Sequence, residues 1–242
     1  MSMLPWNADD LTFDETRFKG VARLFPLPDL VMFPHVMQPL HIFEPRYREM
    51  LNDALDSDGL IAMSILAPGW EANYEGKPRL LPQVCVGKVV THQRLEDGRY
   101  NIMLLGMRRA RLVSEVANGR SFRTAELELL DETYPGEGEA DRAELQAVLC
   151  REFQQALPLP PGAKSPGPVQ DLLAAELPLA VLTDLASFAL PLDAGLKCRL
   201  LAECNVDRRA ELLLETLGKP WKGIPAAPAP AAAGFPPRFS QN

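Results

Sequence analysis

Residues 24–47 read LFPLPDLVMFPHVMQPLHIFEPRY, an apolar stretch that prolines divide into short pieces. Its last residues predict a helix over Pro45 to Asp56, because the missing N–H of Pro45 would be unsatisfied in the first turn of any helix. The apolar residues of this helix fall on one face at a spacing of 3.6 residues: Tyr47, Met50, Leu51, Ala54 and Leu55. We therefore expect the helix to pack on a sheet.

The residues that follow this helix have the pattern of strands. Leu60 to Leu66 is an apolar run closed by Pro68-Gly69, which predicts a strand buried on both faces. Two pairs of segments follow, each around a dipeptide typical of tight hairpin turns, Asp97-Gly98 or Asn118-Gly119. The strands expected in these pairs are Val84 to Leu95, Tyr100 to Leu105, Arg109 to Val116 and Phe122 to Leu130. Two successive hairpins indicate a small curled sheet or an open barrel.

A second, helical part is expected after Tyr134-Pro135-Gly136, where the hydrophobic period changes from two to 3.6. Its first apolar face holds Leu145, Val148, Leu149 and Phe153, and Pro158 to Pro168 is expected to be a loop. Further helices are expected near Val169–Glu176, Leu179–Phe188, Asp193 to Glu203 and Arg208–Leu217, the last capped by Asp207. The expected organisation is an N-terminal extension (1–19), a β-rich subdomain (20–134), a helical bundle (135–220) and a disordered Pro/Ala-rich tail (221–242).

Composition narrows the class of protein. The chain has 242 residues, of which 47% are hydrophobic, enough for a core that needs no disulfide bonds. Its four cysteines are sparse, and the N-terminus has no apolar segment of a signal peptide, so we expect a soluble, cytoplasmic protein that binds no membrane. The formal net charge of -7 is spread over both halves of the chain, which argues against a nucleic-acid-binding protein.

Four segments together resemble one known family. They are residues 24–47, Val86-Gly87-Lys88-Val89-Val90, Gly106 to Leu112, and Leu200 to Leu217. In this order they resemble the N-terminal substrate-binding domain of the ATP-dependent protease Lon, over roughly residues 18–217. The resemblance implies an α+β fold, a PUA-like β pseudo-barrel followed by a small helical bundle, in which a strand ends in Phe-Pro before the first helix. It also implies a module that binds polypeptide.

The motifs of the catalytic modules of Lon are not found. The pair Gly87-Lys88 is followed by Val89 and has no glycine five positions before it, so no phosphate-binding loop is formed. Nor is there a glycine-flanked serine with a downstream lysine for peptidase chemistry. We therefore expect a free-standing, non-catalytic chain without cofactor or metal. Its expected partners are unfolded or partner polypeptides, and a separate ATP-dependent protease or chaperone.

Two groups of residues are candidates for a peptide-binding surface. Phe33, Pro34 and Met37 belong to an apolar, methionine-bearing turn that also includes Ile42 and Phe43. Trp70 and Tyr74 lie in loop 67–79, between two expected strands. Methionine and aromatic side chains suit surfaces that accept varied partners, because methionine repacks easily and aromatic rings supply large contact areas. A core position is the alternative for Phe33, Ile42 and Phe43, whereas Trp70 and Tyr74 are expected to be exposed.

The histidines, two of the cysteines and a group of arginines do not require a metal site or an RNA site to explain them. His35, His41 and His92, and likewise Cys198 with Cys204, have spacings that match no metal site. Three arginines, Arg108, Arg109 and Arg111, could contact RNA. However, no aromatic residues on which bases could stack lie among them, so we expect a solvated strand face with salt bridges. The functions that remain open besides polypeptide binding are an RNA-binding PUA-like protein and a small hydrolase with an unrecognised site.

Overall fold

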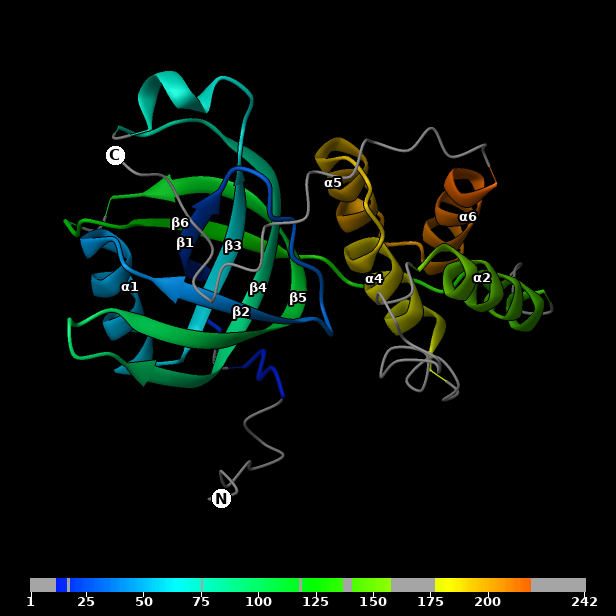
Figure 1. The fold of residues 1–242 in the computed structure, drawn as a ribbon, viewed down its shortest axis with the longest axis horizontal. Coiled ribbons are helices and arrows are strands. Elements are labelled where there is room, and N and C mark those ends of the chain that lie inside the picture. Colours follow the sequence, from blue (N-terminus) through cyan, green and yellow to red (C-terminus); the bar gives the residue numbers. More distant parts are fainter. Residues whose placement is uncertain are drawn as a thin grey trace, which may run out of the picture.

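The structure, a computed structural model, describes residues 12–16, 18–74, 76–117, 119–136, 141–157 and 177–218. These residues form a strand-rich body and a group of helices beside it (Figure 1). The strands are β1 (Val21–Leu27), β2 (Met37–Ile42), β3 (Leu60–Leu66), β4 (Leu80–Arg94), β5 (Tyr100–Val116) and β6 (Arg123–Leu129). The helices are α1 (Pro45–Leu55), a short 3₁₀ helix (Trp70–Asn73), α2 (Arg142–Ala156), α4 (Leu179–Ala189), α5 (Ala194–Ala202) and α6 (Val206–Leu217).

The six strands form one sheet in the order β2-β5-β4-β3-β1-β6, and β6 also pairs with β5, so five of the strands close into a barrel. Only β1 and β3 pair in parallel. Strand β3 is buried along its whole length, which confirms the sequence-based prediction of a strand buried on both faces. Leu60 and Ala62 belong to a core of alanine, valine and leucine side chains from the five barrel strands, whereas Ile61, Met63 and Ile65 belong to a core shared with the helices.

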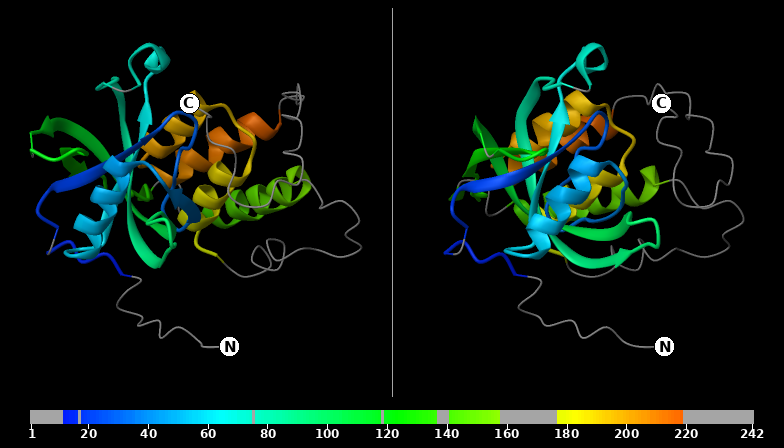
Figure 2. Two further views of the ribbon diagram at one scale, coloured as in Figure 1. Left: turned by 60° about the vertical axis from the view of Figure 1, so that its left-hand side comes forward. Right: turned by 90° about the vertical axis from the view of Figure 1, so that its left-hand side faces the viewer.

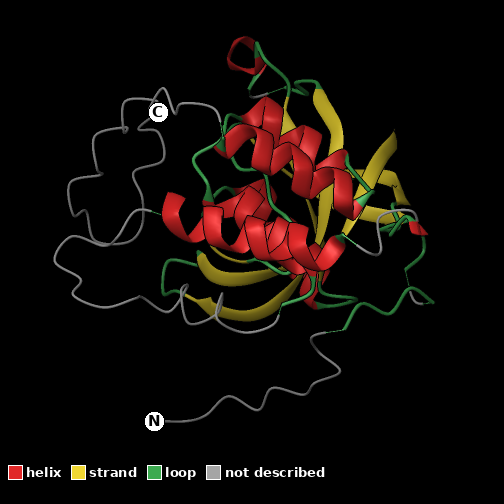
Figure 3. Cartoon of the chain, turned by 90° about the vertical axis from the view of Figure 1, so that its right-hand side faces the viewer, coloured by secondary structure: helices red, strands yellow, loops and turns green. Residues whose placement is uncertain are grey.

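Helix α1 packs on the sheet as expected and buries Tyr47, Met50, Leu51 and Ala54. Arg23 of β1 fixes it from outside, since its guanidinium donates to the Asp53 carboxylate at 2.5 Å and to Asp58 at 2.8 Å. Helices α2, α4, α5 and α6 lie on the opposite side of the barrel from α1 (Figure 2). Viewed from that side, they stand together in front of the strands (Figure 3).

The strand prediction was wrong at two places. Tyr100 to Leu105 and Arg109 to Val116 are not two strands but parts of the single strand β5, because the residues between them continue the pairing with β4 across a bulge. The Phe33-Pro34 pair does not end a strand either. It lies in the loop between β1 and β2, where the chain turns at His35 with a φ of 64°.

The C-terminal helices lie close to where they were expected, with one difference at a helix cap. The N-cap of α6 is Asn205, whose side chain accepts a hydrogen bond from the Arg208 N–H at 3.0 Å, and not Asp207. Asp207 lies in the first turn of α6 and pairs with Arg142 of α2 at 2.8 Å. The helix expected near Val169–Glu176, the loop Pro158 to Pro168, the tail at 221–242 and most of the extension at 1–19 lie outside the described residues.

Candidate functional site

An apolar face on β2 and β5 is open to solvent. Alternate residues of β2 point in opposite directions, so Leu40 and Ile42 are buried while Met37, 49% exposed, and Pro39 face outward. Across the ladder, Met37 lies opposite Leu105 and Pro39 opposite Met103, and both β5 residues are half-buried. We call these four residues, Met37, Pro39, Met103 and Leu105, the methionine face. It brings together side chains about 65 positions apart in the sequence.

The β1–β2 loop places the other candidates of this region differently. Phe33 and Pro34 are buried, so neither side chain is available to a partner in this conformation. The cause is the close approach of the loop to β5, where a Cβ on Gly106 would overlap the Phe33 carbonyl. Ile42 is buried, in line with a core position, whereas Phe43 is 36% exposed.

The turn that follows Pro34 is a bulge with an unusual residue. The His35 N–H donates to the Gly106 carbonyl at 2.9 Å, and the Gly106 N–H donates to the Val36 carbonyl at 2.9 Å. In this type of bulge the first residue has a positive φ and is usually glycine. Here it is His35, whose side chain is 45% exposed. Beside it is a cavity of about 340 Å³ lined by Pro34, His35, Met107, Arg108, Arg109, Leu130, Asp131 and Glu132.

Trp70 and Tyr74 form a pair in the β3–β4 loop, whose 3₁₀ helix projects from the strands (Figure 1). Their rings meet edge to face with centroids 5.5 Å apart, and both side chains are half-buried. The Tyr74 hydroxyl donates to Glu44 at 2.8 Å, and the Arg46 guanidinium lies 5.1 Å from the Tyr74 ring centroid. Burial and the hydrogen bond to Glu44 raise the pKa of Tyr74, so the hydroxyl stays a donor. The loop is thus attached to the start of α1.

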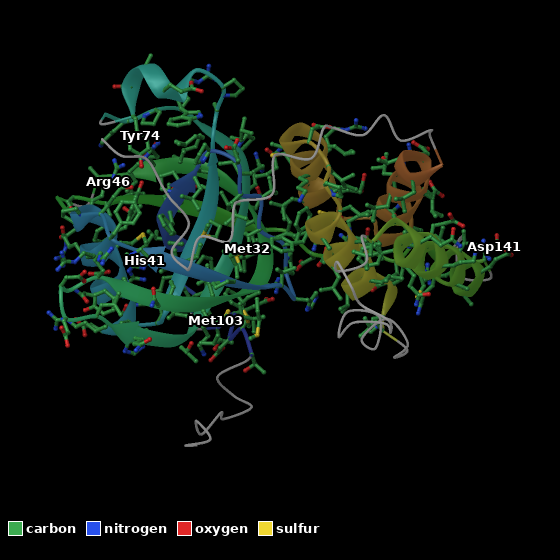
Figure 4. All side chains as sticks on the ribbon, in the orientation of Figure 1. Met32, His41, Arg46, Tyr74, Met103 and Asp141 are labelled. Atoms are coloured by element: carbon green, nitrogen blue, oxygen red, sulfur yellow. The ribbon has the colours of Figure 1, made fainter. Side chains whose placement is uncertain are left out.

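The two regions follow one another along the same side of the barrel. Figure 4 shows Tyr74, Arg46, His41 and Met103 in this order, from the projecting loop toward the β4–β5 hairpin. Phe43 connects them, because it stacks on His41 with ring centroids 6.0 Å apart and precedes Glu44, the partner of Tyr74. Of the residues proposed from the sequence, Met37, Trp70 and Tyr74 are accessible. The structure adds Phe43 and Met103, whose exposure was not expected from the sequence.

The three arginines in the second half of β5, Arg108, Arg109 and Arg111, belong to ion pairs. Arg108 pairs with Glu15 and Asp131, and Arg111 pairs with Glu128, as expected for a solvated strand face. Arg109 contradicts that expectation because it is only 2% exposed. The bulge in β5 turns it toward the helices, where it binds the Asp184 carboxylate in α4, with one bond at 3.1 Å, and Glu132 at 2.9 Å.

This buried cluster ties the barrel to the helices. Arg209 of α6 donates to Glu132 at 2.6 Å and to the Thr183 hydroxyl at 2.8 Å. Burial raises the pKa of the Asp184 carboxyl, while the Arg109 guanidinium opposes the rise. The two arginines and two carboxylates balance in charge, which limits the cost of burying them. The four side chains are bonded to one another, and only the buried Nε of Arg109 has no hydrogen-bond partner among the described residues, so we assign the cluster a structural role.

The described residues offer little reactive chemistry. They contain no group of three or more His, Cys, Asp and Glu side chains that could hold a metal ion. Cys85, Cys198 and Cys204 are free thiols, and burial raises the pKa of the Cys85 thiol to about 12, so this thiol is unreactive near neutral pH. No helix in the described part of the chain is long and apolar enough to span a bilayer.

The arrangement of a closed barrel, a helix on one side and a helical group on the other is that of Lon N-terminal domains. The N-terminal domain of Mycobacterium avium complex Lon protease superposes with a TM-score of 0.63 at 17% sequence identity, covering 83% of this chain and 100% of that chain. A Lon N-terminal domain protein from Xanthomonas campestris gives a TM-score of 0.56 at 22% identity, covering 81% of this chain and 97% of that one. These likenesses confirm the α+β fold.

The sequence comparisons give the family. The model of the ATP-dependent protease La (LON) substrate-binding domain matches residues 21–219, and the chain belongs to this family. It is 32% identical to Lon protease 2 of Desulfotalea psychrophila over 197 residues, which are 80% of this chain and 24% of that protein. It is 26% identical to Lon protease of Escherichia coli K12 over 191 residues, 79% of this chain and 24% of that protein. The chain thus spans about a quarter of the length of these relatives, and the resemblance found in the sequence is confirmed.

Proposed function

We propose that this chain is a non-catalytic, cytoplasmic module that binds unfolded or partner polypeptide and presents it to a separate ATP-dependent protease or chaperone. The methionine face is the observation that carries the proposal. Met37 is the most exposed of the large apolar side chains on β2, and it lies beside Met103 and Leu105 on a surface that no described helix covers.

The chemistry of this face suits polypeptides of varied sequence. Methionine has three rotatable bonds and a polarisable sulfur, so two methionines can adapt to different apolar side chains. Burying one such side chain completely contributes about 1.5–3 kcal/mol, which is enough for weak, reversible binding when several are partly covered. A face held by the β2–β5 ladder needs no reordering of its backbone on binding.

Trp70 and Tyr74 supply a second contact region in the proposal. Their pairing and the bond from Tyr74 to Glu44 hold both rings in place before a partner arrives, which lowers the entropy lost on binding. A polypeptide that covers both regions would pass Phe43 and the start of α1.

RNA binding remains the second candidate because of one observation. Strands β2 and β4, and β5 as far as Ser114, contain no acidic residue, although the protein carries a net charge of -7. The basic side chains of β4, Lys88, His92 and Arg94, could contact phosphates. Against this, the methionine face carries apolar side chains in place of the flat aromatic rings on which bases stack.

The test is fluorescence anisotropy with a labelled model protein, used once in its native state and once reduced and alkylated so that it stays unfolded. We expect saturable binding of the unfolded form alone, without competition by single-stranded RNA. Trp70→Ala with Tyr74→Ala should weaken that binding by about 1–3 kcal/mol, the usual range for aromatic anchors. Tyr134→Ala is the matched control, since Tyr134 is 47% exposed and lies outside both regions. Equal binding of native and unfolded probe, or displacement by RNA, would refute the proposed function.

A further inference from the structure

Strand β4 extends beyond its neighbour β3. The β3 register on β4 runs from Leu66 opposite Leu80 to Leu60 opposite Lys88, and there it ends. Strand β4 continues to Arg94, and from Thr91 to Arg94 it pairs with β5 alone among the described strands. We call Val90–Arg94 the β4 overhang. In Figure 1 it runs along the lower margin of the sheet, with β5 and then β2 above it.

The hydrogen-bond pattern shows which main-chain groups of the overhang face away from β5. The Leu95 N–H donates to the Arg99 carbonyl at 2.8 Å, in the same register that places Gln93 opposite Asn101. Bonded and non-bonded pairs alternate in an antiparallel ladder, so Gln93 and Thr91 bond to β5. The N–H and C=O groups of His92 and Arg94 therefore point to the open side of the strand.

The outward N–H and C=O groups of His92 and Arg94 have the spacing of a β-sheet hydrogen-bond ladder. Two residues in alternate positions present a donor and an acceptor each, which is what an extended polypeptide pairs with when it adds to a sheet edge. A phosphate backbone offers acceptors only, so it would leave the carbonyls of His92 and Arg94 without partners. His92, Gln93 and Arg94 are exposed, so the edge is reachable.

Charge indicates what kind of polypeptide fits. The β4 overhang has no acidic residue, and it carries the guanidinium of Arg94 and the imidazole of His92. Positive side chains on an edge strand repel a second copy of the same edge, as in proteins that avoid sheet-to-sheet aggregation. Acidic side chains directly opposite them would instead be stabilised.

We propose that the β4 overhang takes an extended polypeptide segment with acidic side chains as an additional strand of the sheet. The inference rests on the proposed function and specifies it: the main chain of the segment pairs with His92 and Arg94, and its carboxylates meet the basic side chains. Recognition is then largely independent of the remaining sequence, because the main chain supplies the hydrogen bonds.

The experiment compares two substitutions of His92, so that the contribution of its main-chain N–H to binding is measured apart from that of its side chain. His92→Pro removes an N–H that faces away from β5, and His92→Ala keeps it while removing the imidazole. The probe is a fluorescein-labelled peptide of alternating valine and glutamate, titrated by anisotropy. Loss of one hydrogen bond predicts about tenfold weaker binding for His92→Pro than for His92→Ala, since both variants lack the imidazole and only the proline also lacks the N–H. A peptide with lysine in place of glutamate should bind more weakly than the acidic one.

A second measurement needs no variant and covers the case in which His92→Pro fails to fold. Amide exchange of the wild-type protein should slow at His92 and Arg94 when the acidic peptide is added, while Thr91 and Gln93, already bonded to β5, change little. Unaltered exchange at His92 and Arg94, equal affinity of His92→Pro and wild type, or displacement of the peptide by single-stranded RNA would each overturn strand addition. If unfolded protein still binds in those cases, the proposed function stands; if it does not bind the wild type, both fail.

Discussion

At the scale of single residues, His35 has an uncommon backbone conformation. Its φ of 64° places a residue with a Cβ atom where glycine is usual, and such a conformation costs an ordinary residue about 1–2 kcal/mol. We expect His35→Gly to raise the free energy of unfolding, because glycine removes this strain. The gain should not exceed about 1 kcal/mol, because glycine also has more conformational freedom in the unfolded chain. Urea denaturation measures it. His35→Ala is the control, because alanine keeps the strain, and a destabilised His35→Gly would show that the imidazole contributes more than the strain costs.

Cys85 makes a pH-dependent contribution. Burial raises the pKa of its thiol to about 12 from an ordinary value of 9.0. Above pH 9 the unfolded chain therefore loses this proton while the folded chain keeps it, so the folded state binds more protons and stability falls as pH rises from about 9 toward 12. Thermal melts at increasing pH should show this loss, and Cys85→Ala should reduce its slope. A slope equal to that of the wild type would assign the alkaline loss to other groups.

At the scale of elements, the Arg109–Asp184 pair joins β5 to α4. Asp184→Asn would leave Arg109 and Arg209 with Glu132 as their one remaining carboxylate in the cluster, which is a buried and unbalanced positive charge. Removing one partner of a buried pair typically costs about 3–5 kcal/mol, and we expect a loss of stability in this range by chemical denaturation. The exposed Asp131, paired with Arg108, is the matched control, and Asp131→Asn should cost less than about 1 kcal/mol. Similar losses for the two variants would mean that the cluster does not hold the helices to the barrel.

The same elements show how far sequence patterns predict this structure. The apolar run of β3 and the face of α1 follow from local periodicity, and both were predicted correctly. The sequence did not predict that β5 is one continuous strand, because a glycine such as Gly106 is typical of a strand end. In the structure, Gly106 lies within the strand and lets the β1–β2 loop approach closely. The burial of Arg109 depends on Asp184, 75 positions away, and no local pattern carries that information. For the same reason the sequence pointed to Met37 but not to its neighbour Met103.

At the scale of the whole molecule, the proposed function excludes catalysis by this chain. We expect the purified protein to hydrolyse no ATP and to degrade no casein, since its sequence has neither a phosphate-binding loop nor the Ser-Lys pair of a Lon peptidase. Assays on successive chromatography fractions would measure both activities. Turnover that follows the protein peak through repurification would contradict the non-catalytic assignment.

The central claim is that unfolded polypeptide binds at the methionine face, and substitution within that face tests it most directly. Met37→Ser with Met103→Ser should weaken binding of a labelled unfolded protein by about 1–3 kcal/mol in anisotropy titrations, because two apolar contacts are lost. Val113→Ser with Val116→Ser is the matched control, since both valines are exposed on the far end of β5. We expect a large loss of affinity for the methionine variant and wild-type affinity for the valine variant, with both proteins folded by circular dichroism. Equal affinities of the two variants would contradict it.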